Sequence, residues 1–263
     1  MRLVRPSYEI KWHMPSKAAM ELLEWAGRKC YKSEDKIGEG TAEEFLRRLL
    51  RRNPPHESII EHVSASVCFT VDRGVSHELV RHRLAAYSQE STRYCNYKGG
   101  VTFVIPPWTG WVPRQDLDSH AVIQDFDAVN APPDDQWLYA MAVAEQSYLR
   151  LLAGSWTPQQ ARDVLPNSLK TEVVATYNMR VWRHIFAMRV AEACHPQMRE
   201  VMVPLLEDFK KELPALFENV VPYSDAAKAR LAQLPLRVII DHLLGREGAV
   251  EELAKCVFRE HGG

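Results

Sequence analysis

The sequence has few cysteines, almost no net charge and no long apolar run. Its five cysteines are odd in number and none are spaced as Cys-x-x-Cys, so neither a disulfide framework nor a zinc ribbon fits. No apolar run approaches the ~20 residues that a membrane-spanning helix needs, and residues 1–14 contain no apolar signal core. The sequence therefore predicts reduced thiols, a cytoplasmic location and no membrane contact.

The charge balance also argues against a class of partner. There are 33 Lys and Arg residues against 34 Asp and Glu, whereas a bulk nucleic-acid binder usually has a net basic face. A local basic pocket for a small phosphorylated ligand remains compatible with this balance. His77 and His82 are five residues apart, which departs from the i,i+4 spacing of a helical metal pair. We therefore expect neither nucleic acid nor a metal.

The 263 residues suit one large domain, or a core domain with appendages. Strict alternation of apolar and polar residues over Val63–Asp72 predicts a half-buried strand. Residues 169–178 also alternate, and they are rich in β-branched side chains, so a strand is favoured over a helix there. A helix is expected to follow from about Met179 to Ala187.

Several helix starts carry local signals. Thr41–Glu44 has the capping-box pattern, and Thr157–Gln160 combines a cap with proline at the first helical position. Asp134 and Asp135 precede a helical pattern that Gly154 can end. Helices and strands mixed in this way predict an α/β (mixed α+β) fold, with an antiparallel-rich central sheet flanked by helices.

Two regions depart from this pattern. Residues 106–133 are rich in Pro, Trp and Asp, and they are expected to form an irregular insertion. After residue 222 the pattern changes to short helices with polar breaks. We therefore expect a core domain of residues 1–222 and a helical C-terminal extension of residues 223–263.

The densest group of polar side chains lies between Arg81 and Tyr94 and includes three arginines. Guanidinium groups bind phosphate through paired, charge-assisted hydrogen bonds. A helix capped by Ser76 could run into Arg81, and a solvated basic helix end is the alternative interpretation. On a helix Arg81 and Arg83 would lie ~200° apart, whereas in an extended chain they would share one face. Either way the segment points in two directions, which suits a position between two ligands or two subunits.

Five blocks in order, between residues 55 and 197, resemble the flavin-dependent thymidylate synthases. The most specific is Arg-His-Arg at 81–83, seven residues, Ser91 and then Thr-Arg-Tyr, which matches the family signature at every fixed position. The other blocks are His56-Glu57-Ser58 with Glu61-His62, Ala161-Arg162-Asp163-Val164-Leu165-Pro166, Asn178-Met179-Arg180, and Phe186-Ala187-Met188-Arg189 with His195-Pro196-Gln197.

The resemblance implies an enzyme that methylates dUMP to dTMP. The methylene group would come from methylenetetrahydrofolate, and the hydride from FADH2, which NADPH regenerates. It also implies a homotetramer whose active sites are shared between subunits. A non-catalytic nucleotide- or RNA-binding module is the alternative, but such a module has no reason to keep the flavin residues in register with Arg81–Arg83.

The resemblance also implies roles for individual residues. Arg189 would stabilise negative charge on the uracil ring, and with Ser91 it forms the expected catalytic pair. The flavin would be held by Ser58, Arg81, His82, Arg83, Gln89, Asn178, Arg180 and His184. The dUMP would be held by Glu78, Arg81, Gln89, Glu90, Ser91, Thr92, Arg93, Arg162 and Arg189.

The chain departs from the family pattern at a few positions. Glu78 and Gln89 stand where the family often has Gln and Glu, and His184 stands where it can have Asn. Two further side chains need an interpretation of their own. Cys95 has no adjacent cation except Lys98 to lower its pKa, so a packed or loop thiol is favoured over a nucleophile. The basic run at 47–52 is expected to be a solvated helix face.

Overall fold

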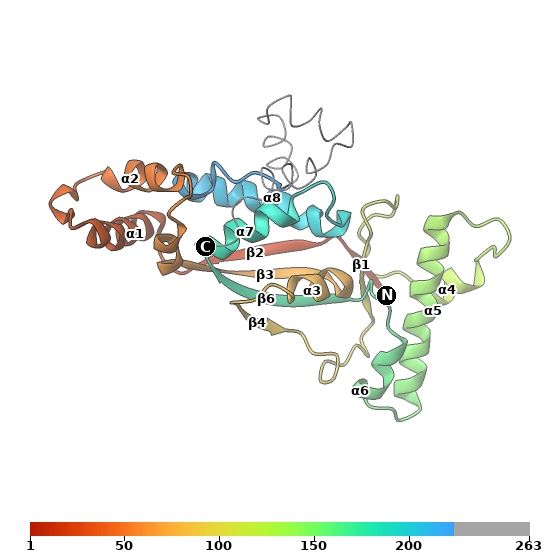
Figure 1. The fold of residues 1–263 in the computed structure, drawn as a ribbon. Helices are drawn as coiled ribbons and strands as arrows, with labels where there is room; N and C mark the ends of the chain where they lie inside the picture. Colours follow the sequence, from red (N-terminus) through yellow and green to blue (C-terminus); the bar gives the residue numbers. More distant parts are fainter. Residues whose placement is uncertain (224–263) are drawn as a thin grey trace, which may run out of the picture.

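The computed structural model describes residues 1–223, which are built around a four-stranded antiparallel sheet (Figure 1). The strands lie in the order β2-β3-β6-β4, so β2 and β4 are its edges. Their bounds are Ser7–Trp12 for β2, Ser64–Asp72 for β3, Lys170–Asn178 for β6 and Ala86–Gln89 for β4. The predicted fold class is confirmed.

The two long central strands are those that the alternation predicts, each beginning one residue later than expected. β3 and β6 pair along their full length, from Ser64 opposite Asn178 to Asp72 opposite Lys170. The inward side chains of β3, from Ala65 to Val71, are completely buried. Burial of each larger apolar side chain contributes roughly 1.5–3 kcal/mol, which fixes the strand register.

The helices cover one face of this sheet and extend beyond both of its ends (Figure 1). α7 (Met179–Arg189) and α8 (Pro196–Glu212) lie along the sheet, and α3 (Arg73–Leu79) follows β3 directly. The remaining helical segments are α1 Ser16–Tyr31, η1 Glu34–Lys36, α2 Thr41–Leu50, η2 Glu57–His62, α4 Ser119–Gln124, α5 Pro133–Ala153, α6 Pro158–Ala161, η3 Arg162–Val164 and α9 Pro214–Phe217.

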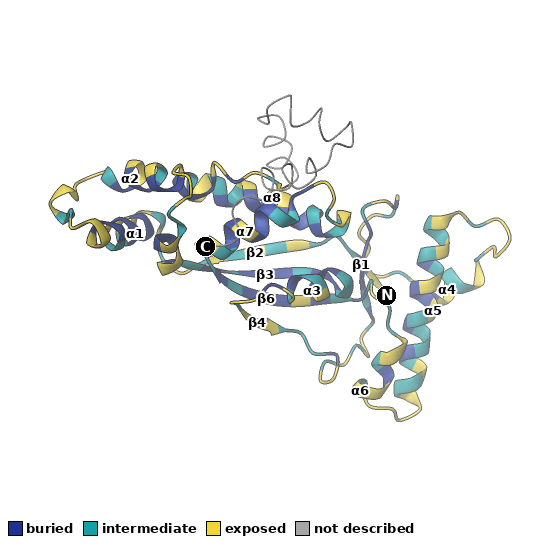
Figure 2. Ribbon diagram, viewed as in Figure 1, coloured by how far each residue is buried: buried dark blue, intermediate teal, exposed yellow. Residues whose placement is uncertain are grey.

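The larger hydrophobic core lies between the sheet and the helices α7 and α8 (Figure 2). Trp182 of α7 is fully buried at its centre. Its ring contacts Phe69 of β3, Phe186 of α7 and Phe209 of α8, with centroids 5.1–6.5 Å apart. Aromatic packing of this kind contributes beyond simple area burial. It holds α7 rigidly against the sheet.

A second, smaller core lies at the end of the molecule that carries α5. Here β1 (Arg2–Val4) pairs in parallel with β5 (Thr102–Val104). Leu3 and Phe103 of these strands pack with Met141 and Tyr148 of α5. Gly154 caps α5, as predicted.

Four local expectations need correction. Asp72, not Ser76, is the N-cap of α3, because its carboxylate accepts a hydrogen bond from the Val75 amide while Ser76 lies inside the helix. Likewise α2 begins at Thr41 itself, after the N-cap Gly40 in the left-handed region at φ 75°. The two aspartates expected ahead of α5 lie in its first turn, where they favour the helix dipole.

The fourth correction concerns the segment 106–133. It is mostly irregular, as predicted, but it contains the short helix α4, capped by the Asp118 carboxylate. The capping box at Thr157 is confirmed, because the Gln160 side chain accepts from the Thr157 amide at 2.9 Å. The expected C-terminal extension lies outside the described residues apart from Tyr223, so the division at residue 222 stays a prediction.

Candidate active site

A cleft of about 930 Å³ opens beside the start of α7. Its walls come from η2, from the turn after α3, from α7 itself and from the chain after α9. Five arginines and two glutamates line it, so its lining carries an excess of positive charge. Such a cleft is suited to a large anionic ligand.

The turn Arg81–Leu84 forms one wall because α3 ends at Leu79 and the chain then reverses into β4. Leu84 has φ 62° and is 87% exposed. Arg81 and Arg83 are exposed, whereas His82 between them is buried. Residues 81–84 are thus neither helical nor a strand but a turn, in which both arginines are exposed and His82 points inward. Within residues 1–223, neither arginine makes a side-chain hydrogen bond or ion pair, so both can bind a ligand.

His82 is joined to Arg189, the last residue of α7. The Arg189 Nε donates to His82 Nε2 at 3.0 Å, and Nη1 donates to the Glu78 carboxylate at 2.8 Å. Burial, with the charges of Arg189 and His184 nearby, lowers the pKa of His82 to about 4. His82 is therefore neutral at pH 7 and its Nε2 is a hydrogen-bond acceptor. The side chain of Arg189 lines the cleft.

The start of α7 forms a second wall of the cleft. The Asn178 side chain caps the helix by accepting from the Val181 amide at 2.9 Å, which leaves its amide N–H groups available. Arg180 donates to Glu61 at 2.6 Å, and His184 is hydrogen-bonded to the Tyr223 hydroxyl at 2.6 Å. Asn178, Arg180 and His184 all line the cleft, so the structure brings the predicted flavin residues of α7 together.

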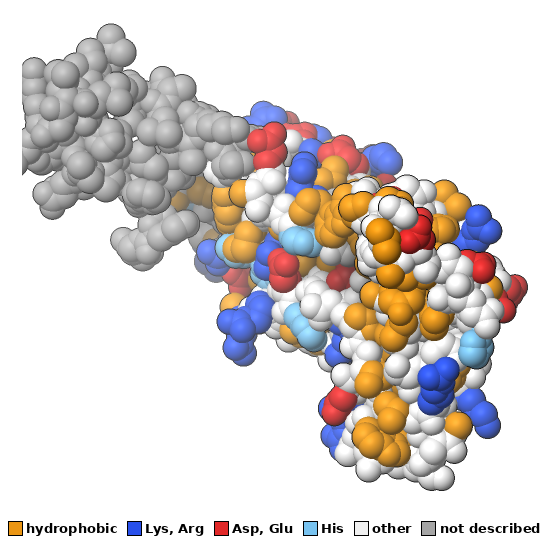
Figure 3. Space-filling view, turned by 90° about the vertical axis from the view of Figure 1, so that its right-hand side faces the viewer, with side chains coloured by type: hydrophobic (Ala, Val, Ile, Leu, Met, Phe, Trp, Pro, Cys, Tyr) orange, Lys and Arg blue, Asp and Glu red, His pale blue; other side chains and the backbone are white. Residues whose placement is uncertain are grey.

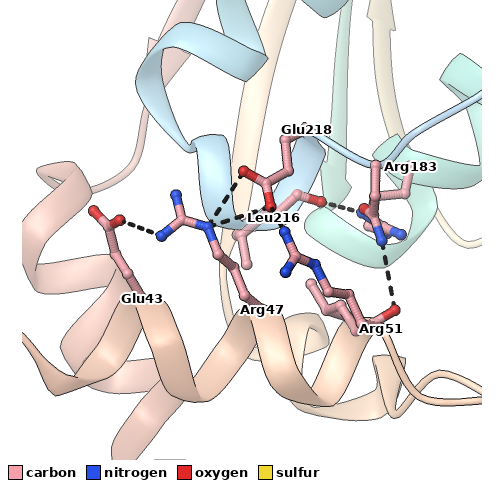
Figure 4. A network of polar contacts seen from close by, with 8 residues as sticks. Glu43, Arg47, Arg51, Arg183, Leu216 and Glu218 are labelled. Atoms are coloured by element: carbon pink, nitrogen blue, oxygen red, sulfur yellow. Dashed lines mark hydrogen bonds and ion pairs between the residues drawn. The ribbon is translucent and has the colours of Figure 1, made fainter.

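The chain after α9 forms the third wall of the cleft, and a buried arginine that is absent from the predicted site residues holds it in place. Arg183 donates to Glu57 of η2 at 3.0 Å and to the Asn219 side chain at 2.8 Å. It also donates to the Leu216 carbonyl, as Figure 4 shows. The neighbouring Glu218 is paired with two arginines of α2, Arg47 and Arg51. These contacts hold the segment after α9, which forms this wall. No local sequence pattern indicates them, because they join residues between 33 and 171 positions apart.

The remaining predicted site residues lie elsewhere. Ser58 is in η2 next to Glu57, but it is not among the residues that line the cleft. Glu78 does not line the cleft itself, but its carboxylate accepts a hydrogen bond from Arg189, which does. The others form a second cluster around the end of β4, with Gln89, Glu90, Ser91, Thr92, Arg93 and Arg162 as its members.

The second cluster, residues 89–93 with Arg162, is held together by hydrogen bonds. Arg162 donates to the Thr92 hydroxyl at 3.2 Å, and the Arg93 amide donates to Ser91 Oγ at 3.3 Å. Gln89 donates to two hydroxyls on α3 and β6. The Glu90 carboxylate accepts from Lys170 at 3.1 Å and from the Tyr97 hydroxyl at 2.8 Å. Two guanidinium groups beside a small hydroxyl-rich turn suit a phosphate.

The cleft lies at one end of β6, whereas the second cluster begins opposite the middle of this strand, where Gln89 pairs with Val173. Asn178 at one end of this strand lines the cleft, and Lys170 at the other end is bonded to Glu90. Gln89, the first residue of the second cluster, pairs with Val173, which is five residue steps from Asn178, and five steps correspond to ~17 Å of strand. In one copy of the chain the two groups are therefore separated along β6. Within the described residues, no group of three or more His, Cys, Asp or Glu side chains is placed to hold a metal ion.

Comparison with known proteins agrees with this geometry. The family described as thymidylate synthase complementing protein matches residues 13–215. The flavin-dependent thymidylate synthases of Mycobacterium tuberculosis H37Rv and Mycobacterium sp. strain KMS are 32% and 31% identical over 231 residues, covering 87% of this chain and 90% of each relative. The chain belongs to the flavin-dependent thymidylate synthase family.

Solved structures share the fold. The UMP/dUMP methylase PolB from Streptomyces cacaoi, bound with 5-Br dUMP, aligns with a TM-score of 0.62 at 26% identity, covering 83% of this chain and 96% of that one. Thymidylate synthase X from Helicobacter pylori, with FAD and dUMP, aligns with a TM-score of 0.63 at 20% identity, covering 82% and 99%. The second likeness, at this identity, concerns the fold alone.

Proposed function

We propose that this protein methylates dUMP to dTMP, with methylenetetrahydrofolate as one-carbon donor, FAD as cofactor and NADPH as reductant. One observation carries this proposal: of the eight residues expected to hold the flavin, six line one cleft, namely Arg81, His82, Arg83, Asn178, Arg180 and His184. Its volume of about 930 Å³ lies near the upper end of the range for cofactor sites. A phosphate-binding module would not need this arrangement.

The arginines and the helix start fit the cofactor. Arg81 and Arg83 provide unpaired guanidinium groups for its diphosphate, and Asn178 presents amide donors at the start of α7. When bound, FAD supplies the hydride that completes the methyl group, and the protein orients the rings and balances their charge. The cytoplasmic location and NADPH as the reductant stay predictions.

Arg189 has the geometry for the uracil contact. Of its five N–H groups, one donates to His82 and two donate toward Glu78, which leaves two for a ligand. These three bonds hold the guanidinium plane before the substrate arrives. A preorganised cation at the uracil edge stabilises the negative charge that develops when carbon 5 becomes the nucleophile.

We further propose that the working enzyme is a homotetramer in which residues 89–93 and Arg162 of one copy complete the cleft of another. The separation of the two groups along β6 within one chain supports this proposal, since ~17 Å of strand lie between Asn178 and the residue that pairs with Gln89. The surface supports it as well, because a band of hydrophobic side chains covers the end of the molecule that carries α5 (Figure 3). Exposed hydrophobic side chains on or near α5 include Trp108, Val112, Val129, Val143 and Trp156.

Two measurements on one preparation test the proposed reaction. Purified protein incubated with FAD and then desalted is expected to keep a flavin absorbance band. It is also expected to form dTMP only when dUMP, methylenetetrahydrofolate and NADPH are all present. Folded protein that stays colourless, or that binds FAD and forms no dTMP, would contradict the proposal.

A further inference from the structure

A second hollow, of about 460 Å³, lies between α1, η1 and α2, and the proposed reaction assigns it no role. Its lining includes four cations, Arg28, Lys36, Arg48 and Arg52. Among the described residues that line it, Glu44 is the sole carboxylate. The hydroxyl groups of Ser33 and Thr41 add neutral hydrogen-bonding partners. We call this feature the basic hollow.

Three of these cations are unusual because they lack partners. The buried Arg28 is paired with Glu24 at 2.8 Å and forms part of the base of the hollow. Lys36, Arg48 and Arg52 are exposed and make no ion pair with any residue in the range 1–223. Other cations of α1 and α2 are paired: Lys17 with Glu21, Lys29 with Glu34, and Arg47 with Glu43. The unpaired cations therefore gather at the hollow.

The basic run after Phe45 divides into two groups. Arg47, and Arg51 one helical turn further on, face Glu218. Arg48 and Arg52 are each one residue later, which turns them ~100° around the helix axis and into the hollow. The basic run that was expected to be a solvated face thus contains two arginines that are paired with Glu218 and two that line the hollow.

Aromatic rings hold the unpaired guanidinium groups in place. The Arg52 guanidinium carbon lies 5.8 Å from the centre of the Tyr31 ring, and that of Arg48 lies 5.9 Å from the Phe45 ring. Cation–π contact restrains a guanidinium without using its N–H donors. These donors remain available for an incoming anion, and less side-chain entropy is lost when it binds.

The basic hollow is linked to the cleft through the contact of Tyr31 with His56. The Tyr31 hydroxyl is hydrogen-bonded to His56 Nδ1 at 2.5 Å, and the two rings are stacked with 6° between their planes. Tyr31 lines the hollow, and Glu57, the residue after His56, lines the cleft. An elongated ligand could therefore place its ring in the cleft and pass over Tyr31 and His56 into the hollow.

We propose that the basic hollow binds the carboxylate tail of the folate co-substrate, the chain of glutamates attached to its aromatic ring. This inference rests on the proposed function. The cleft already has unpaired arginines, Arg81 and Arg83, for the diphosphate of the dinucleotide. A polyglutamate tail adds a carboxylate with every residue, and three unpaired cations around one hollow match such a ligand. The phosphates of FAD or NADPH are the competing anions.

The experiment compares tail lengths. In the wild-type enzyme, the KM for pentaglutamyl methylenetetrahydrofolate is expected to be about tenfold below that for the monoglutamyl form, because two or three partly exposed ion pairs contribute together. The ratio of the two KM values is expected to fall toward one at high salt, since exposed charges are screened. In the double variant Arg48→Gln and Arg52→Gln the ratio is expected to be about one at low salt as well.

A matched control removes two exposed cations away from the hollow, Lys17→Gln with Lys211→Gln, and is expected to keep the wild-type ratio. Flavin absorbance and the KM for NADPH are measured on each preparation. A wild-type ratio of one, or a ratio that survives in the hollow variant, overturns the proposal. So does a hollow variant whose main defect is weaker FAD or NADPH binding. Absence of dTMP formation in the wild type would instead count against the proposed function.

Discussion

The Nε of Arg189 donates a hydrogen bond to Nε2 of His82 across 3.0 Å, which joins the end of α7 to the turn after α3. The bond requires a neutral imidazole, because a protonated one has no acceptor. Glu78 holds the other side of the same guanidinium at 2.8 Å. The orientation of the proposed uracil contact thus depends on the protonation state of the central histidine of the signature.

The first prediction concerns pH. The pKa of His82 is about 4 in the folded chain, against 6.5 when unperturbed, so the unfolded chain takes up the proton first as pH falls. The contribution of His82 to stability is present above pH 6.5 and is lost as pH falls from 6.5 through about 4. The free energy of unfolding, measured in urea from pH 7.5 to 5, is expected to decline less in His82→Gln, whose side chain can still accept from Arg189. Equal slopes in the two proteins would refute this role.

The second prediction concerns the fork of Arg189. Arg189→Lys keeps the charge but loses the parallel donors, so turnover is expected to drop on the order of 100-fold or more. The variant is expected to fold, to remain a tetramer and to bind FAD. If Arg189 only stabilised the helix end, lysine would serve nearly as well, because the dipole interaction of about 0.3–1 kcal/mol needs only a cation. Turnover near the wild-type value would move the uracil contact to Arg162.

The third prediction concerns two tyrosines behind the signature turn. The Tyr87 hydroxyl lies 2.9 Å from the Leu79 carbonyl, 2.8 Å from the His82 carbonyl and 2.6 Å from the hydroxyl of the buried Tyr177. One O–H donates once, so the Tyr177 hydroxyl donates to Tyr87, whose proton is shared between the carbonyls. Tyr87→Phe leaves that buried hydroxyl without its acceptor.

Tyr87→Phe is therefore expected to lower the free energy of unfolding by about 1–3 kcal/mol. Adding Tyr177→Phe is expected to cost little more, because the pair is coupled. Urea unfolding of the two single variants and the double variant measures the coupling directly. If the losses in the free energy of unfolding are strictly additive, the two hydroxyls act separately, and the proposed hydrogen bond from Tyr177 to Tyr87 does not stabilise the turn.

The sequence predicts the regular elements well because their signals are local. The alternation of β3 and β6 reflects one buried face, and the capping box at Thr157 uses only neighbouring residues. It misplaces the start of α3 because Asp72 also fits the alternation of the strand. Both Asp72 and Ser76 are suitable N-cap residues, and no local signal distinguishes them. The point at which the chain turns after β3 selects Asp72.

The residues of the candidate site also fall into those that the sequence indicates and those that depend on long-range contacts. Four of the five arginines that line the cleft are expected from the resemblance, and the structure brings them together. Its third wall, from Asn219 to Tyr223, and the buried Arg183 that holds it depend on long-range contacts with no sequence pattern. The separation of the second cluster from Asn178 likewise follows only from the pairing of β4 with β6, which places Gln89 opposite Val173.

The most direct test of the shared active site is complementation between two defective chains. One carries Arg189→Lys in the cleft, and the other carries Arg93→Ala with Arg162→Ala in the second cluster. The two are co-expressed with different tags, and the mixed tetramers are isolated. If each site combines the cleft of one copy with the second cluster of another, random mixing yields intact sites at about one in four. We predict dTMP formation at about a quarter of the wild-type rate, far above either variant alone. Activity no higher than the average of the two variants would contradict the account.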